Sequence, residues 1–466
     1  MHYLIGDLGH LFIILSVVTS AFTFFLYLRA VTSKDNLSNK QWIENGRAGF
    51  YLHTLSVIGV IVCLYLIIYN HYFEYHYAYS HSSRSLPVYY MVSCFWEGQE
   101  GSFLLWMFWQ ALLGIILIRT QKEWEAPVMS IFALVQAFLS SMILGVVIPG
   151  IELKIGSSPF ILLREAMQDP IFATNPDFIP ADGHGLNPLL QNYWMVIHPP
   201  TLFLGFAATL IPFSFCLSGL YFKKYTEWIK PALPWALFGG TVLGIGILMG
   251  GYWAYETLSF GGYWNWDPVE NAVYVPWLIL VAAIHTMMLY KSKQRGLGIS
   301  IILVVSVFLL ILYSTFLTRS GILGDASVHS FTDLGLSGQL LVYLLVFCAG
   351  AILLIALRWK QLPLKADEIE VYAPEFWVFL GMAALCLMGF QVLIPTSFPV
   401  INKVLGLAGI QSSLAPPADQ IGFYSKLQLW FAVSVAMLSG LAQFFWWGKI
   451  KKGESKKSLI SSILIT

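Results

Sequence analysis

The sequence predicts an all-α protein, a polytopic membrane bundle of about eleven transmembrane helices, and three observations support this. Of the 466 residues, 57% are hydrophobic and 11% are charged, whereas soluble domains contain about 45 to 50% apolar and about 25% charged residues. Apolar runs of about 20 residues, the length that crosses a bilayer, recur along the chain. Lys and Arg gather between alternate runs, as in multi-pass proteins. We therefore expect residues 1–466 to form a single polytopic membrane domain.

The candidate spans are apolar runs separated by Gly, Pro and polar residues. In chain order they cover residues 8–28, 49–69, 102–118, 127–148, 200–222, 232–251, 273–290, 298–317, 338–357, 375–394 and 427–447. The apolar residues 458–466 at the C-terminal end are too few to cross a bilayer.

The basic residues assign the two faces of the bundle. Twenty of the 26 Lys and Arg residues follow odd-numbered spans, and six lie elsewhere. Because short basic loops stay on the inner side, this bias predicts an N-terminus outside and a C-terminus inside. The outer segments are then the long ones, residues 70–101, 149–199, 252–272, 318–337 and 395–426. Their length makes the outer face the expected working face.

Charge and cysteine usage exclude several classes. A formal net charge of +1 predicts no nucleic-acid partner. The basic inner loops favour contact with anionic membrane lipid instead. The five cysteines are scattered singly without a CxxC or zinc-type spacing, so we interpret them as small buried apolar residues.

The most unusual stretch is rich in tryptophan and lies between two apolar spans. It contains Trp253, Trp264 and Trp266 within fourteen residues. Asp267, which is followed by proline, can cap the next helix, and Glu270 completes the spacing of a capping box. An extended backbone would place Trp264 and Trp266 on one face. The stretch therefore predicts a flat stacking surface fixed to a helix start.

Three histidines and one arginine stand out beside this surface. His198 precedes two prolines and an apolar span, so we expect it at an outer helix start. His329 follows Arg319 on the outer face, and Arg319 at the membrane boundary suits a carboxylate. His285 lies within a span, where an ionisable side chain is a functional candidate. Two imidazoles, aromatic rings and a cation together suit haem, a planar iron ligand with two carboxylates.

The remaining histidines favour other interpretations. His71, His76 and His81 lie in a Tyr-rich outer segment whose composition is typical of a membrane-interface belt. A metal site formed by these three residues is the alternative.

Several motifs resemble a known family. They are Trp264-Asn265-Trp266-Asp267-Pro268-Val269-Glu270-Asn271 with Pro276-Trp277, Asn187-Pro188-Leu189-Leu190, Ile197-His198-Pro199-Pro200, Leu317-Thr318-Arg319-Ser320-Gly321, Ser327-Val328-His329 and Glu97-Gly98-Gln99-Glu100-Gly101-Ser102. The first resembles the WWD signature of haem-handling proteins in cytochrome c maturation. Together they are similar to the CcmF family of haem lyases, although that family often has His where Gln99 stands.

The resemblance implies roles for these residues. His198 and His329 would be the axial ligands of the haem being attached and the residues central to catalysis. Trp253, Trp264 and Trp266 would hold its ring plane. His285 would bind a second, transmembrane b-type haem. No histidine follows His329, so the second ligand of that haem would be absent or come from another chain or residue, with His53 one candidate.

The resemblance also implies a setting. The chain would be a haem lyase, or cytochrome c synthetase component, in a bacterial inner membrane, with its active face periplasmic. It would act in a complex, take haem from the chaperone CcmE, and meet apocytochrome c presented by CcmH-type subunits. Two alternatives stay open. One is a haem or small-solute transporter, for which glycines in span 232–251 leave room. The other is a non-catalytic assembly scaffold.

Overall fold

The computed structural model describes residues 1–150, 153–167, 169–258, 262–324, 335–364 and 374–447. Within these ranges, eleven helices are long and apolar enough to cross a membrane, which confirms the predicted bundle. They are α1 (Tyr3–Thr32), α2 (Asn36–Tyr69), α5 (Gln99–Thr120), α6 (Glu125–Met142), α9 (Tyr193–Tyr221), α10 (Ile229–Thr257), α11 (Pro268–Lys293), α12 (Leu297–Arg319), α13 (Ser337–Arg358), α14 (Pro374–Thr396) and α16 (Gln420–Trp447).

Shorter elements fill the segments between the long helices. They are α3 (His76–His81), α4 (Val88–Glu97), α7 (Leu163–Ala166), α8 (Ile171–Thr174), α15 (Phe398–Leu407), the 3-10 turns η1 (Pro188–Leu190) and η2 (Trp359–Gln361), and the strands β1 (Val146–Ile148) and β2 (Leu153–Ile155). The prediction that span four continues to residue 148 is wrong. Gly145 adopts a φ of 67°, which ends the helical path before β1 pairs with β2 as a hairpin.

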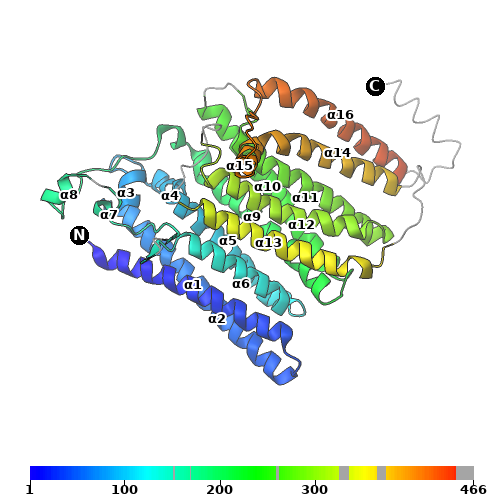
Figure 1. The fold of residues 1–466 in the computed structure, drawn as a ribbon, viewed down its shortest axis with the longest axis horizontal. Helices are drawn as coiled ribbons and strands as arrows, with labels where there is room; N and C mark the ends of the chain where they lie inside the picture. The colour runs from blue at the N-terminus through cyan, green and yellow to red at the C-terminus, as the bar shows by residue number, and fades with distance from the viewer. Residues whose placement is uncertain (151–152, 168, 259–261, 325–334, 365–373, 448–466) are drawn as a thin grey trace.

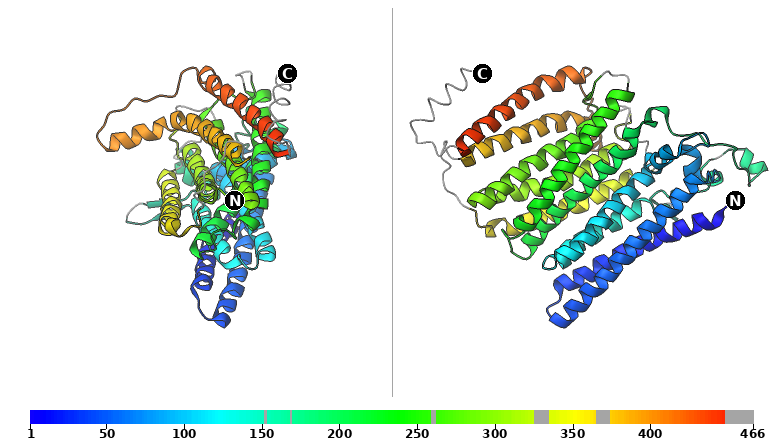
Figure 2. Two further views of the ribbon diagram at one scale, coloured as in Figure 1. Left: turned by 90° about the vertical axis from the view of Figure 1, so that its right-hand side faces the viewer. Right: turned by 180° about the vertical axis from the view of Figure 1, so that it is seen from behind.

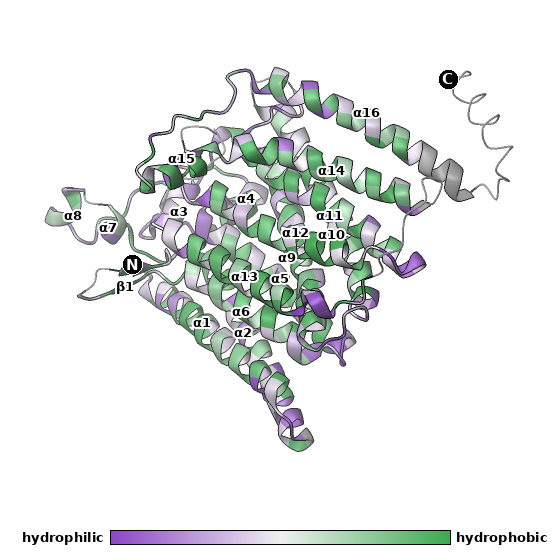
Figure 3. Cartoon of the chain, turned by 45° about the vertical axis from the view of Figure 1, so that its right-hand side comes forward, coloured by the Kyte–Doolittle hydropathy of each residue, from purple (hydrophilic) through white to green (hydrophobic). Residues whose placement is uncertain are grey.

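The long helices lie side by side in a slab (Figures 1 and 2). Helices α1, α2, α5 and α6 occupy one side of the slab, while α14 and α16 occupy the other. The short helices α3, α4, α7, α8 and α15 gather at one end of the bundle (Figure 1). The segments expected on the outer face therefore share one end. Figure 3, in which the ribbon is coloured by residue hydropathy, shows hydrophobic residues along the spans and hydrophilic residues concentrated near their ends.

Helices α9 and α10 pack closely because glycines remove side chains from their interface. A Cβ added at Gly205 would lie 2.8 Å from the Leu243 Cα, and one at Gly246 would lie 3.0 Å from the Leu202 Cα. Despite its glycines, α10 is continuous from Ile229 to Thr257. A transporter built on discontinuous helices would need a break there, so the alternative loses its main support in the sequence.

A charged cluster joins α1, α2 and α6 at the end of the bundle away from the short helices. Glu125, only 1% exposed, accepts from Arg47 Nε at 2.6 Å and Arg47 Nη2 at 2.7 Å. The Tyr27 hydroxyl donates to the same carboxylate at 3.2 Å. This bidentate pair fixes the three helices relative to one another at the end away from the short helices.

Candidate functional site

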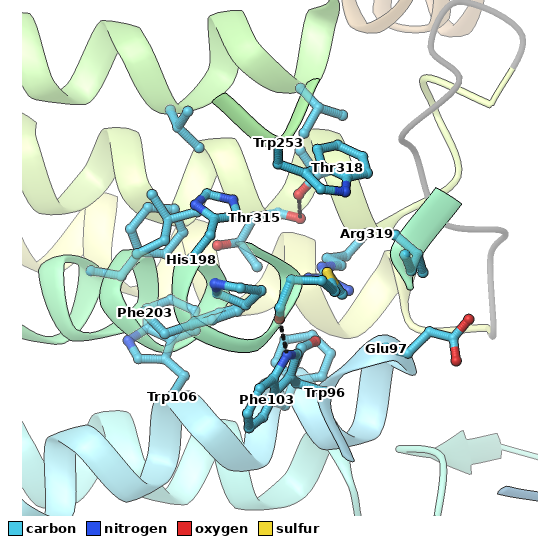
Figure 4. A pocket seen from close by; sticks show the side chains of 18 of the residues that line it. Trp96, Glu97, Phe103, Trp106, His198, Phe203, Trp253, Thr315, Thr318 and Arg319 are labelled. Carbon is cyan, nitrogen blue, oxygen red and sulfur yellow. Dashed lines mark hydrogen bonds between the residues drawn. The ribbon is translucent and has the colours of Figure 1, made fainter. Parts of the chain in front are cut away.

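A cavity of about 510 Å³ lies at the end of the bundle that carries the short helices. Its volume falls within the range of about 300 to 1,000 Å³ typical of small-molecule sites. Lining residues come from α3, α4, α5, η1, α9, α10, α11 and α12. Four of the five predicted outer segments therefore contribute to one cavity. Among the predicted site residues, His198, Trp253 and Arg319 line it together (Figure 4).

His198 lies in α9 and not at its start, as the sequence suggested. The helix begins five residues earlier, where the Asn192 side chain accepts from the Trp194 backbone N–H at 2.8 Å. His198 Nδ1 lies 2.8 Å from the Gly246 carbonyl oxygen on α10. Because a carbonyl only accepts, Nδ1 carries the proton and Nε2 is left as the nitrogen with the lone pair. A neutral imidazole fixed in this tautomer is suited to bind a metal.

Two prolines inside α9 open its hydrogen-bond ladder beside this histidine. Pro199 and Pro200 cannot donate to the carbonyls of Met195 and Val196, four residues earlier. The Trp96 indole N–H takes up the first of these, donating to the Met195 oxygen at 2.9 Å. The proline pair therefore creates an acceptor that ties α4 to α9, as the dashed line in Figure 4 shows.

Aromatic rings make up much of the cavity lining. Phe103 and Trp106 come from α5, and Phe203 comes from α9. The Trp253 indole N–H donates to the Leu189 carbonyl oxygen in η1 at 3.1 Å, which fixes its ring against the loop. The centroids of Trp106 and Phe203 are 6.3 Å apart and tilted by 45°. This wall suits a large, flat, apolar ligand.

Arg319 supplies a cation at the last residue of α12. It lines the cavity beside Thr315 and Thr318 of the same helix. The negative charge of the Glu100 carboxylate interacts electrostatically with the Arg319 guanidinium. The same carboxylate accepts a hydrogen bond from the Ser157 hydroxyl at 2.6 Å. Since Glu100 is 9% exposed, the cation has a counter-charge within the protein while it also lines the cavity. A ligand carboxylate would meet a favourable field there.

Trp264 and Trp266, by contrast, lie outside the lining of this cavity. The expected extended backbone is wrong, because Trp266 has a φ of 58°, which breaks the extended path that would place Trp264 and Trp266 on one face. Their rings meet edge to face at 5.8 Å. Trp266 also stacks on Tyr424 at 5.4 Å and donates to the Ser425 hydroxyl at 3.0 Å. Trp266 thus joins the loop before α11 to α16, and Trp264 packs against Trp266 and against Tyr274 of α11.

The predicted cap of α11 is confirmed. Asp267 accepts from the Val269 N–H at 2.9 Å, and Glu270 accepts from the N–H groups of Asn265 at 2.9 Å and Asp267 at 3.1 Å. A capping box fixes both the loop and the helix start. Because Val269 and Val273 of α11 line the cavity, Asp267 and Glu270 support the site through this helix.

Of the two other predicted histidines, the structure describes only His285, which does not line this cavity. His329 lies outside the described residues. His285 is exposed on α11, with Nδ1 2.8 Å from the Val281 carbonyl oxygen. His53 is fully buried on α2, with Nδ1 3.0 Å from the Ser16 oxygen on α1. A buried residue between α1 and α2 does not share a site with an exposed residue on α11.

Several lining residues escaped prediction as site residues, notably Trp96, Phe103 and Trp106. The sequence feature that could have indicated them is the motif from Glu97 to Ser102, because these aromatic residues lie just before and after it. In the structure this motif forms the junction between α4 and α5.

Comparisons with known proteins point to the same part of the chain as the cavity. Residues 96–323, which hold most of the lining, match the family described as Cytochrome C assembly protein. The chain is 30% identical to "Cytochrome c-type biogenesis protein CcmF" of Haemophilus influenzae, over 80% of this chain and 54% of the relative. It is 30% identical to the protein of the same name from Escherichia coli, over 91% of this chain and 62% of the relative.

A solved structure shares the fold. "Cytochrome c Heme Lyase CcmF" superposes with a TM-score of 0.70 at 21% identity, over 94% of this chain and 61% of that chain. The present chain thus spans less than two thirds of the length of these relatives. Sequence identity over most of the chain, the match to residues 96–323 and the common fold show that it is related to the CcmF cytochrome c biogenesis proteins.

Proposed function

We propose that this protein binds haem in the cavity lined by His198 and positions it for attachment to apocytochrome c, as a haem lyase component. The observation that carries the proposal is the hydrogen bond between His198 Nδ1 and the Gly246 oxygen, 2.8 Å long. It reserves Nε2 for the iron, in a cavity that also contains a cation and an aromatic wall. The names of the relatives, which refer to cytochrome c biogenesis, support the same function.

Haem fits the donor set. Its macrocycle is flat and apolar, and Phe103, Trp106 and Trp253 give the cavity an apolar, aromatic lining. Its two propionates are carboxylates, for which Arg319 offers a guanidinium. Imidazole is a common ligand of haem iron. Haem bound here supplies the vinyl groups to which cysteine thiols add.

We propose His329 as a second residue that would hold the haem iron. It follows Arg319 by ten residues, and the end of α12 already borders the cavity. Trp264 and Trp266 would then act as a brace between α11 and α16 beside the site, with Asp267 and Glu270 holding the loop.

We also keep His285 as a separate proposal for a transmembrane haem ligand. Its ring is exposed, so a haem at this position would lie at the surface of the bundle. Its other axial ligand would come from a neighbouring chain.

The similarity to the CcmF proteins also suggests the membrane, the orientation and the partner proteins. We propose that the chain works as one polytopic unit in a bacterial inner membrane, with its N-terminus and cavity on the periplasmic side. The segregation of basic residues supports this orientation. CcmE would deliver the haem, and CcmH-type subunits would present the apocytochrome. The chain's own contribution is to hold haem and thiols in a reactive geometry, which can lower a barrier by about 7 to 11 kcal/mol.

The test is complementation. A bacterial strain that lacks its own CcmF would carry this full-length chain together with the other maturation proteins, and covalent haem in a reporter cytochrome c would be stained after electrophoresis. We expect the wild-type chain to restore staining and His198→Ala to abolish it, while His184→Ala, which changes an exposed histidine of the outer segments, retains it. Equal staining with His198→Ala would contradict the proposal.

A further inference from the structure

A second histidine, paired with a carboxylate, lies on the same cavity. His81 Nδ1 at the end of α3 is 3.0 Å from Glu97 Oε2 at the end of α4. Both residues line the cavity that contains His198 and Arg319. Figure 4 shows Glu97 at the edge of the group, beyond Arg319. The pair therefore shares the cavity in which we propose that haem binds.

The pair is held firmly in place. The His81 side chain is 23% exposed and that of Glu97 is 15% exposed. The Tyr77 ring packs against His81 with centroids 4.6 Å apart. The Tyr77 hydroxyl donates to the Phe95 oxygen at 2.8 Å and accepts from the Gly98 N–H at 3.2 Å, which fixes both ends of α4's last turn. Such packing limits the positions that the imidazole can take.

The hydrogen bond also sets the chemistry of His81. A carboxylate only accepts, so Nδ1 carries the proton and Nε2 is basic. A histidine oriented by a carboxylate is a common general base. The titratable groups facing it are Glu97 on α4, Tyr77 and His76 on α3, and, across the cavity, Arg319.

The metal site considered for the outer histidines does not form among the described residues. His71 Nε2 is 3.2 Å from the Ser83 oxygen, and His76 Nε2 is 3.2 Å from the Ser80 hydroxyl. Each of the three histidines thus has its own polar partner, and only His81 lines the cavity.

We propose that His81 is the base for the cysteine thiol in haem attachment and that Glu97 is its positioning residue. This inference rests on the proposed function. His81 Nε2 takes the proton as the S–H bond breaks, and the sulfur bonds to the vinyl carbon next to the macrocycle. The imidazolium returns the proton to the terminal vinyl carbon, which becomes a methyl group. The addition consumes no oxidant or reductant, and it needs a base because the thiolate is the nucleophile.

The test measures the rate of thioether formation in membranes that contain the full-length chain with the other maturation proteins. Ferrous haem and a peptide containing Cys-X-X-Cys-His are supplied across a range of pH, and bound haem is followed separately by absorbance. We expect His81→Gln to keep its haem spectrum but to lose about 100-fold in rate at pH 7. The loss should shrink as pH rises through the thiol pKa of about 8.5. His76→Gln is the matched control on α3.

A second readout does not depend on product formation. Mesohaem has ethyl groups in place of vinyls, so the bound peptide cannot react with it. The rate of peptide alkylation by iodoacetamide then reports the thiolate present. We expect the wild-type protein to accelerate alkylation at pH 7, and both His81→Gln and Glu97→Gln to reduce it.

The outcomes separate the two proposals. Equal thioether rates in wild type and His81→Gln would overturn the role of His81 alone, as would a loss that does not change with pH. A lost haem spectrum in His81→Gln would make His81 an iron ligand and would also overturn it. Wild-type membranes that bind no haem and form no product would overturn the proposed function, and this inference with it.

Discussion

The Trp96 indole N–H donates to the Met195 carbonyl oxygen at 2.9 Å, across the boundary between α4 and α9. That acceptor is available because Pro199 lacks the N–H that would otherwise bond to it. The bond positions one wall of the cavity relative to the helix that carries His198. The prolines that free the Met195 carbonyl oxygen therefore directly follow His198, the proposed iron ligand.

Replacing Trp96 by Phe should weaken haem binding without unfolding the protein. The variant keeps an aromatic ring but loses a hydrogen bond worth about 1 kcal/mol, so we expect the Kd for haem to rise about fivefold in an absorbance titration. Trp430→Phe, at a position on α16 that is 72% exposed, is the control. If both variants bound haem as tightly as wild type, the bond would have no part in forming the site.

Gly250 should tolerate no side chain. A Cβ there would lie 2.8 Å from His198 Cε1, so Gly250→Ala pushes the imidazole away from the Gly246 oxygen. We expect at least a tenfold weaker haem affinity and an altered haem spectrum. Gly350→Ala in α13 is the matched control, because a Cβ there has nothing within 4 Å among the described residues. A normal spectrum in Gly250→Ala would show that the ring position is not critical.

The cap of α11 should contribute to stability and to the order of the Trp-rich loop. Glu270→Ala removes the acceptor for the Asn265 and Asp267 N–H groups. We expect a loss of about 1 kcal/mol in unfolding free energy, measured by thermal unfolding in detergent. Unchanged stability would mean that water replaces the carboxylate at no cost.

The Arg47–Glu125 pair should be more important than other charged contacts at the same end of the bundle. Glu125 is 1% exposed, and its removal leaves Arg47 without its bidentate partner. We expect Glu125→Ala to cost about 3 kcal/mol. Glu227→Ala provides the comparison, because the Lys224–Glu227 contact of 3.7 Å is largely exposed and is expected to contribute less than about 1 kcal/mol. Similar losses in the two variants would contradict this ranking.

The bundle itself was predictable because each spanning helix depends on the apolar residues of one continuous run. About twenty apolar residues in a row form a helix in a bilayer because this satisfies their backbone groups, and each of the eleven predicted runs overlaps a spanning helix. The cap formed by Asp267 and Glu270 was also predictable, since it depends on a spacing of three residues. Short amphipathic elements such as α4 escaped because they lack the length that marks a span.

The cavity was only partly predictable, since its walls come from distant parts of the chain. His198 and Arg319 stood out because each is a polar residue at a span edge. Trp96 and Trp106 did not, because in a chain with 17 tryptophans aromatic residues next to a span are usually interfacial or core residues. The positive φ of Trp266 carries no sequence signal at a non-glycine residue, and it redirects a ring that seemed part of the site.

The most direct test of the central claim is a haem titration of the purified full-length protein and its His198→Ala variant. The account predicts that the variant has a Kd for haem at least tenfold higher, a loss of about 1.4 kcal/mol, and that His184→Ala matches wild type. Equal affinity and an unchanged haem spectrum in His198→Ala would contradict the assignment of this cavity as the haem site.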